Sequence, residues 1–149
     1  MDLFRRSKIM VGREEWEYAA SPDPGDTSIP WLVREGLKRL DLEIIQGEGG
    51  IAPGVSYFHA PGHTPGCYAV SLETGNGTVV LAGDALKYYR EIVTGVSDMP
   101  FGSMEDSARS IWRITSTADR IVPGHFPELV KAGSRFVWER GAAFNLLVR

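Results

Sequence analysis

The stretch Phe-His-Ala-Pro-Gly-His-Thr-Pro-Gly at residues 58–66 places His63 in a turn rich in proline and glycine, directly after a run typical of a β-strand. Two later stretches repeat this arrangement: Leu-Ala-Gly precedes Asp84, and Ile-Val-Pro-Gly precedes His125. Because each polar side chain follows a predicted strand, a sheet can bring all three to one edge. The pattern therefore predicts a site assembled from strand ends.

Two imidazoles and one carboxylate are the ligands that a catalytic metal ion commonly uses. His63, Asp84 and His125 would give Zn²⁺ three protein ligands and leave a further position for water. The same set suits iron or manganese, so zinc is the first expectation and not the only one. An isolated histidine or aspartate in a glycine-rich turn is more often a capping or surface residue. Three of them at strand ends favour a metal site.

Other polar residues lie close to these turns in the sequence. His59 falls inside the predicted strand. We expect it either to hydrogen-bond to a metal ligand without binding the metal itself, or to be a hydrogen-bonded core histidine. Lys87, Tyr88 and Tyr89 follow the Gly-Asp turn and could bind a substrate oxygen. A solvated lysine and two packing tyrosines are an equally good interpretation of these three residues.

The hydrophobic pattern predicts a mixed α/β fold. Glycine and asparagine at 75–77 favour a hairpin turn, and the apolar run 79–82 is typical of a central strand covered on both faces. On the helix that begins at Ser103, Ile111 and Trp112 share a face, which predicts a buried Trp112. The expected strands are 8–11, 42–45, 55–59, 68–73, 78–82 and 120–122, and the expected helices cover 13–19 and begin near Pro30, Ser103 and Pro127.

The last of these expected helices carries many apolar residues, which could face a partner. They are Leu129, Phe136, Val137, Phe144 and Leu147. We expect Trp31 and Trp138 to lie in the core or at an interface.

Length and composition indicate one folded domain over residues 1–149. A formal net charge of -3 with scattered basic residues gives no electrostatic signature for nucleic acid. No apolar run approaches the length of a membrane span and no apolar signal segment is evident, so we expect a cytoplasmic protein without a membrane partner. Cys67 is the single cysteine, which excludes an intrachain disulfide, and we expect it to be a small buried residue.

The three strand-end turns, in their order and spacing, resemble the metallo-β-lactamase superfamily. The resemblance implies an αββα sandwich and a metal-dependent hydrolase. It also implies that His63 is a ligand of one metal site, that Asp84 is the carboxylate that often bridges two ions, and that His125 is the last histidine of the second site.

The sequence departs from that family at its hallmark cluster His-x-His-x-Asp-His, which is absent. The chain therefore resembles the later part of the fold, as a partial domain that spans 1–149, and we expect one metal ion per site rather than two. A sandwich reduced in this way exposes a sheet edge and apolar surface. We expect self-association into a homodimer or a higher oligomer to cover them.

The expected activity is metal-dependent hydrolysis of an ester bond in a small-molecule substrate. A metal-bound water supplies the nucleophile in such enzymes, and Asp84 could act as a general base if no metal is bound. Phosphodiesters or phosphotriesters are slightly favoured over lactones and carboxylic esters. The alternatives are a non-catalytic truncated remnant that folds as an oligomer, and a chain whose other half comes from a separate polypeptide.

Overall fold

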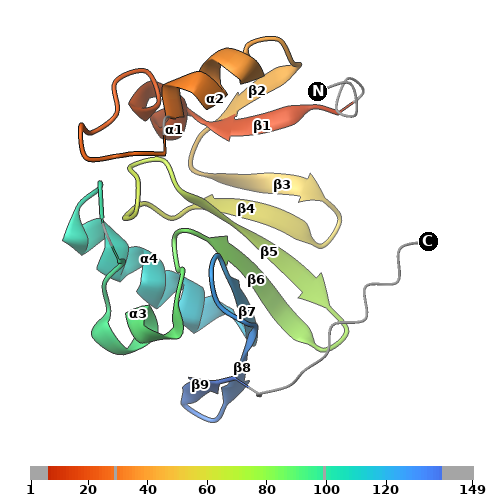
Figure 1. The fold of residues 1–149 in the computed structure, drawn as a ribbon. Coiled ribbons are helices and arrows are strands. Elements are labelled where there is room, and N and C mark those ends of the chain that lie inside the picture. Colours follow the sequence, from red (N-terminus) through yellow and green to blue (C-terminus); the bar gives the residue numbers. More distant parts are fainter. Residues whose placement is uncertain (1–6, 29, 99, 139–149) are drawn as a thin grey trace.

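The computed structural model places the chain in a mixed α/β fold with two sheets (Figure 1). It describes residues 7–28, 30–98 and 100–138. The smaller sheet is a parallel pair, and the chain passes through two helices between its strands. In chain order these elements are β1 (Ile9–Gly12), α1 (Arg13–Tyr18), α2 (Pro30–Leu37) and β2 (Leu42–Ile45).

The larger sheet has seven strands, which follow the chain order from β3 to β9. They are β3 (Glu48–Ala52), β4 (Val55–His59), β5 (Tyr68–Thr74), β6 (Gly77–Gly83), β7 (Arg120–Pro123), β8 (Leu129–Ala132) and β9 (Arg135–Val137). Neighbouring strands are antiparallel except β6 and β7, which are parallel. A parallel pair needs a long crossover, and here α3 (Tyr89–Thr94) and α4 (Met104–Thr117) provide it.

The core lies between the larger sheet and α4 (Figure 1). Val80 of β6 and Ile121 of β7 are fully buried, as is Ile114 of α4. These residues belong to one cluster that also includes Phe58, Leu86 and Leu129. Burial of such aliphatic side chains contributes about 1.5–3 kcal/mol each, so this packing fixes the strand ends that carry the site.

The opposite face of the larger sheet is open at its centre. Leu81 and Val122 are direct register partners on β6 and β7, and their side chains are 39% and 37% exposed. The expectation that the run 79–82 is covered on both faces is therefore wrong. Strand side chains alternate between faces, and in the described part of the chain only the face of Val80 is covered at this point.

Helix α4 turns a different face to the core than its sequence predicts. Ile111 is buried as expected, but Trp112 is 71% exposed, so the prediction of a core tryptophan is wrong. The buried residues of α4 are Ser107, Ser110, Ile111 and Ile114.

Close packing against the turn before His63 explains the buried serines. A Cβ atom on Gly62 would stand 2.6 Å from the Cα of Ser107, and Ser110 Oγ donates a hydrogen bond to the carbonyl oxygen of Pro61 at 2.7 Å. Larger side chains on α4 would push the turn away. A hydrophobic pattern cannot reveal this contact because serine counts as polar.

The predicted helix after Pro127 is a β-hairpin formed by β8 and β9. Leu129 and Phe136 point to the core, and Gly133 has a positive φ of 65° that suits the connecting turn. Alternation of buried and exposed side chains therefore overrides the helical interpretation. Phe144 and Leu147 lie outside the described residues.

Two further elements have weak sequence signals. Strand β3 uses a glycine-rich segment that is not among the expected strands, and α3 follows the Gly-Asp turn without a clear helical pattern. Trp31 is 52% exposed and so lies outside the core, whereas Trp138 packs edge-on against Phe126. None of the described helices is long and apolar enough to cross a membrane.

Candidate active site

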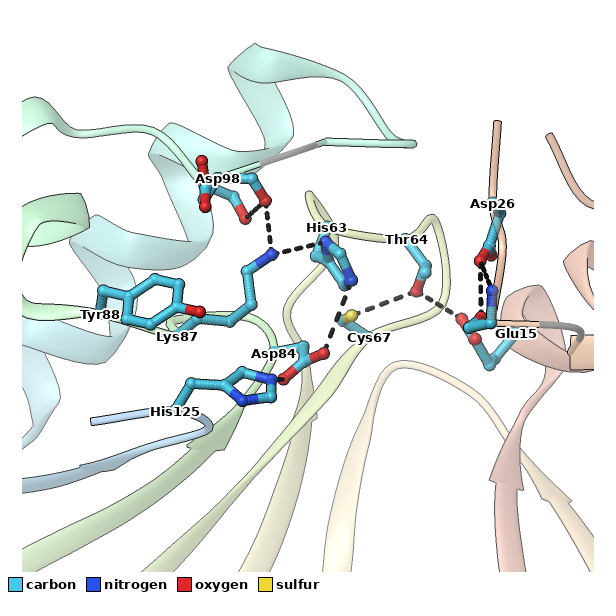
Figure 2. Close-up of polar contacts among 12 residues, drawn as sticks. Glu15, Asp26, His63, Thr64, Cys67, Asp84, Lys87, Tyr88, Asp98 and His125 are labelled. Carbon is cyan, nitrogen blue, oxygen red and sulfur yellow. Dashed lines mark hydrogen bonds and ion pairs between the residues drawn. The ribbon is translucent and has the colours of Figure 1, made fainter. Parts of the chain in front are cut away.

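Three strand ends of the larger sheet bring His63, Asp84 and His125 together (Figure 2). His63 follows β4, Asp84 follows β6 and His125 follows β7. The Nε2 atom of His63 lies 3.5 Å from Asp84 Oδ2, and the Nε2 atom of His125 lies 3.1 Å from Asp84 Oδ1. The carboxylate thus stands between the two imidazoles, with one oxygen facing each.

Glycines allow this close arrangement. Gly83 has a φ of 50°, which turns the chain sharply before Asp84. A Cβ atom on Gly124 would stand 2.6 Å from Asp84 Oδ1, so a larger residue there would displace the carboxylate. The Gly124 N–H also donates to the carbonyl oxygens of Gly83 and Leu86, at 3.0 and 3.1 Å, which joins the two turns.

Lys87 is almost completely buried beside His63, although the sequence suggests a solvated or substrate-binding lysine equally well. Its Nζ atom donates to the carbonyl oxygen of Asp98 at 2.6 Å and lies 3.2 Å from His63 Nδ1 (Figure 2). Lys87 therefore links the His63 turn to the segment that precedes α4.

The other residues singled out by the sequence lie at different depths around the site. The ring of Tyr88 stacks on the ring of His125, with centroids 5.8 Å apart, whereas Tyr89 stacks on Phe126. His59 Nε2 lies 2.8 Å from the carbonyl oxygen of Pro65 and so supports the turn that carries His63. Lys87 and Tyr88 thus contact the candidate histidines, and Tyr89 contacts the neighbouring aromatic cluster.

Glu91 is a buried residue of the site region that sequence reasoning missed. Its carboxylate accepts hydrogen bonds from the backbone N–H groups of Lys87, Tyr88 and Asp98. A buried carboxylate is costly unless it is hydrogen-bonded in this way. Glu91 therefore fixes the backbone on both sides of the Lys87 side chain.

A pocket of about 320 Å³ opens at Asp84 and His63. One wall comes from the α1 side of the molecule: Thr64 Oγ1 donates to Glu15 Oε2 at 2.5 Å and lies 3.1 Å from Cys67 Sγ. The residues that line the pocket are Glu15, Asp26, Thr27, Ser28, His63, Thr64, Cys67, Asp84 and Phe101. The loop that precedes α2 thus contributes to the site.

Asp26 and Cys67 have shifted pKa values in this pocket. Burial alone would raise the pKa of Asp26, but hydrogen bonds donated by Ser28 and by Tyr18 Oη outweigh it and hold that pKa below its usual value of 3.8. Burial raises the pKa of the Cys67 thiol, against a smaller opposite effect of the hydrogen bonds with Thr64. Asp26 therefore adds a negative charge near His63 that no sequence motif indicates.

The donor atoms suit a metal ion in kind but not in number. Within residues 7–28, 30–98 and 100–138, no group of three or more histidine, cysteine, aspartate or glutamate side chains is placed to hold one ion. His63 and His125 face different oxygens of Asp84 and so do not converge on a common point. These residues alone do not form a complete metal site.

Comparison with known proteins connects this arrangement to hydrolases. A family model of the metallo-beta-lactamase superfamily matches residues 3–125. An N-acyl homoserine lactonase from Bacillus sp is 33% identical over 103 residues, which are 68% of this chain and 38% of that relative.

Two similar solved structures contain bound N-acyl homoserines. One is an N-acyl homoserine lactone hydrolase with N-hexanoyl-L-homoserine at its catalytic metal center, with a TM-score of 0.66 and 27% identity over 83% of this chain and 49% of that one. The other is a B. thuringiensis AiiA mutant with N-decanoyl-L-homoserine bound at the active site, with the same score, identity and coverage.

The matches cover most of this chain but only part of each relative. The chain spans 38% of the Bacillus sp lactonase and about half of each of the two solved structures. The family match covers most of the chain, from before β1 to His125, and includes all three strand ends of the candidate site. The chain belongs to the metallo-beta-lactamase superfamily and has its fold.

Proposed function

We propose that this chain forms part of a metal-dependent hydrolase that opens the ester bond of lactones, with acylated homoserine lactones as the leading substrate class. The support is the identity of 33% to a homoserine lactonase together with the placement of Asp84 between two histidines. The Bacillus lactonases that resemble this chain give no support to the phosphoester preference that the sequence suggests, so lactones move ahead of phosphodiesters and phosphotriesters.

The observation that carries the proposal is the pair of distances at Asp84. Zinc ligands at about 2.0–2.2 Å in tetrahedral geometry lie about 3.3–3.6 Å from one another. The separation of 3.5 Å to His63 falls in that range, and the separation of 3.1 Å to His125 is slightly shorter. Each Asp84 oxygen and its histidine are therefore spaced like two ligands of one ion.

This geometry favours two half-sites over the single three-ligand ion suggested by the sequence. Each half-site has two described ligands, while a catalytic zinc usually has three. We propose that ligands from elsewhere, in a second copy or in another polypeptide segment, complete the site. Zinc is the leading metal, with iron or manganese as alternatives.

Contacts within the chain would hold the imidazole rings of His63 and His125 in one orientation. Asp84 faces both histidines, Lys87 lies against His63 and Tyr88 stacks on His125. These contacts all come from the short segment 84–88 and restrict the orientations of both rings, which supports pre-organised ligand placement.

Hydrolysis assays with matched variants test the proposal. We expect the purified protein supplied with Zn²⁺ to hydrolyse N-hexanoyl homoserine lactone faster than a chromogenic phosphotriester. Asp84→Ala, His63→Ala and His125→Ala should each lower the lactone rate by at least about 100-fold, whereas Glu105→Ala, a change on the exposed side of α4, should not. Lactone hydrolysis that survives all three substitutions and chelation would contradict the proposal.

A non-catalytic protein is the second candidate function. The observation in its favour is that the described residues give each half-site two ligands only. Under this alternative the protein folds, binds no stoichiometric metal and turns over neither substrate. Metal analysis of the purified protein therefore separates the two candidates.

Self-association remains part of the proposal. The Leu81 and Val122 side chains form an apolar patch on the open face of the larger sheet, and a symmetric contact could cover it in both copies. Light scattering should give a dimer or a larger species for the native protein and a smaller species for Leu81→Lys. A native monomer at micromolar concentration would contradict this part.

A further inference from the structure

A cleft of about 700 Å³ lies between α4 and the turn that carries His63. Its volume falls within the range of small-molecule binding sites. Of the described residues, none lines both this cleft and the pocket at Asp84 and His63, so a ligand of the cleft would be distinct from the ester substrate. The lining residues on which its chemistry depends are Pro61, Pro65, Asp106, Arg109, Trp112 and Arg113.

Trp112 gives the cleft an aromatic surface that is open to solvent. It is 71% exposed, whereas tryptophan residues are usually largely buried. Pro61 and Pro65 add apolar groups to the same cleft. An aromatic ring that entered the cleft could stack on the indole in an offset or edge-on arrangement. The cleft therefore favours a ligand with a planar aromatic part.

Hydrogen bonds fix the two prolines of the cleft. Ser110 Oγ of α4 donates to the carbonyl oxygen of Pro61 at 2.7 Å, and His59 Nε2 lies 2.8 Å from the carbonyl oxygen of Pro65. The backbone of Trp112 is held by α4 itself. The walls are therefore in place before a ligand binds, which lowers the entropy lost on binding.

Arg113 supplies hydrogen-bond donors to the cleft. Its guanidinium lies over the ring of the buried Phe58, 4.3 Å from the ring centroid, and this contact restricts its orientation. Its Nη2 atom donates to Glu48 Oε2 at 2.5 Å, while its Nε and Nη1 atoms have no acceptor among the described residues. Their N–H groups remain for a ligand, and a negatively charged oxygen forms the stronger hydrogen bonds with a guanidinium.

The lining charges favour a ligand with a single negative charge. Arg109 and Arg113 are cations, and Asp106 is the one carboxylate among the described lining residues. Glu105 and Glu48 pair with these arginines from outside the lining, and their side chains are 85% and 70% exposed. Solvent screens such exposed charges. An excess of one cation suits a carboxylate better than a doubly charged phosphate.

We propose that this cleft is a binding site for a small aromatic carboxylate. The ring of the ligand stacks on Trp112, and its carboxylate accepts hydrogen bonds from Arg113. The combination of an exposed indole with a guanidinium that keeps unpaired N–H groups carries the assignment. The site does not depend on the proposed function, because its test measures binding and not hydrolysis.

Titration of the native protein with phenylacetate, followed by NMR, tests the site. We expect a Kd of about 1 mM or tighter, with a saturable shift of the Trp112 indole N–H. Phenethyl alcohol keeps the ring without the charge, and cyclohexylacetate keeps the charge without the aromatic ring. Each should bind at least about fivefold more weakly. Equal affinity for phenylacetate and either analogue, or no saturable binding of phenylacetate, would overturn the proposal.

Variants with matched controls locate the site. Trp112→Leu and Arg113→Met should each weaken phenylacetate binding at least about fivefold, with circular dichroism confirming the fold. Trp31→Leu changes an exposed tryptophan of α2 and Arg135→Met changes an exposed arginine of β9, so both should keep the native affinity. Native affinity in either cleft variant would overturn the assignment.

Asp84→Ala separates the cleft from the candidate active site, where a carboxylate could also bind. We expect this variant to bind phenylacetate as the native protein does, because Asp84 does not line the cleft. Loss of binding in Asp84→Ala would place the ligand at the strand ends and would overturn the proposal.

Discussion

Gly124 lies directly against the carboxylate of Asp84, because a Cβ atom at position 124 would stand 2.6 Å from Asp84 Oδ1. Real Cβ atoms do not approach an oxygen this closely, so the absence of a side chain at Gly124 determines where the carboxylate can lie. The turn that carries His125 therefore packs against the turn that carries Asp84 without room for one additional carbon atom.

Replacing Gly124 should damage the site more than the fold. Gly124→Ala must move the turn of Asp84 or the turn of His125, because its Cβ atom would also stand 2.7 Å from the carbonyl oxygen of Gly83. We expect at least about a tenfold loss of lactone hydrolysis with about 1–3 kcal/mol lost from the free energy of unfolding. Gly50→Ala is the matched control, since a Cβ there meets open space. Equal activities of the two variants would show that the contact has no role in the reaction.

Removing the Glu91 carboxylate should destabilise the Lys87 segment. Glu91→Ala leaves one buried and two partly buried backbone N–H groups without their acceptor, and an unsatisfied buried group costs about 1–3 kcal/mol. We expect a loss of at least about 2 kcal/mol in urea unfolding, and faster hydrogen exchange at the amides of Lys87 and Asp98. Glu105→Ala should leave both quantities within experimental error.

The ion pair between Arg120 and Glu128 predicts a pH-dependent stability. Hydrogen bonds from Arg120, at 2.7 Å to each carboxylate oxygen, hold the pKa of Glu128 below its usual value of 4.5. A lowered folded-state pKa stabilises the protein above pH 4.5, and this contribution is lost as the pH falls through the folded-state value.

Glu128→Gln should therefore cost about 1 kcal/mol at pH 7 and progressively less in acid. Urea unfolding of both proteins between pH 7 and pH 3 measures the difference. A difference that grows as the pH falls below 4.5 would contradict the assignment.

Cys67 should react slowly with thiol reagents in the native protein. Burial raises the pKa of its thiol, and the thiolate is the reactive form. At pH 8 we expect a disulfide reagent to label the native protein at least about tenfold more slowly than the urea-unfolded protein. Equal rates would show that the thiol is exposed in the native state.

The strand ends of the site could be predicted from the sequence because the relevant signals are local. An apolar run precedes each of His63, Asp84 and His125, and a Pro-Gly or Gly-Asp turn ends each run. Both signals lie within a few residues of the site residue. Neighbouring strands then bring these ends together, since the larger sheet follows the chain order.

The contacts around the site could not be predicted because they depend on packing between distant segments. Glu91 has the sequence signal of an ordinary exposed glutamate, and its three backbone partners become evident only in the folded chain. Asp26 reaches the pocket from the loop between α1 and α2, and no local pattern links that loop to the strand ends.

The buried face of helix α4 could not be predicted either, because it depends on how closely another segment packs against the helix. The hydrophobic pattern favours Trp112 for the core, but the turn at Gly62 approaches so closely that Ser107 and Ser110 occupy the contact instead. The sequence predicts a helix where β8 and β9 form a hairpin, because their apolar residues also fit a helical spacing.

The parallel pairing of β6 with β7 has a consequence for the order in which the site assembles during folding. Strands β3 to β6 form an antiparallel meander of short-range contacts, which close quickly. Strand β7 can join only after α3 and α4 have crossed over, a slower loop closure. His63 and Asp84 should therefore be in place early in refolding, and docking of His125 should coincide with the final rate-limiting phase.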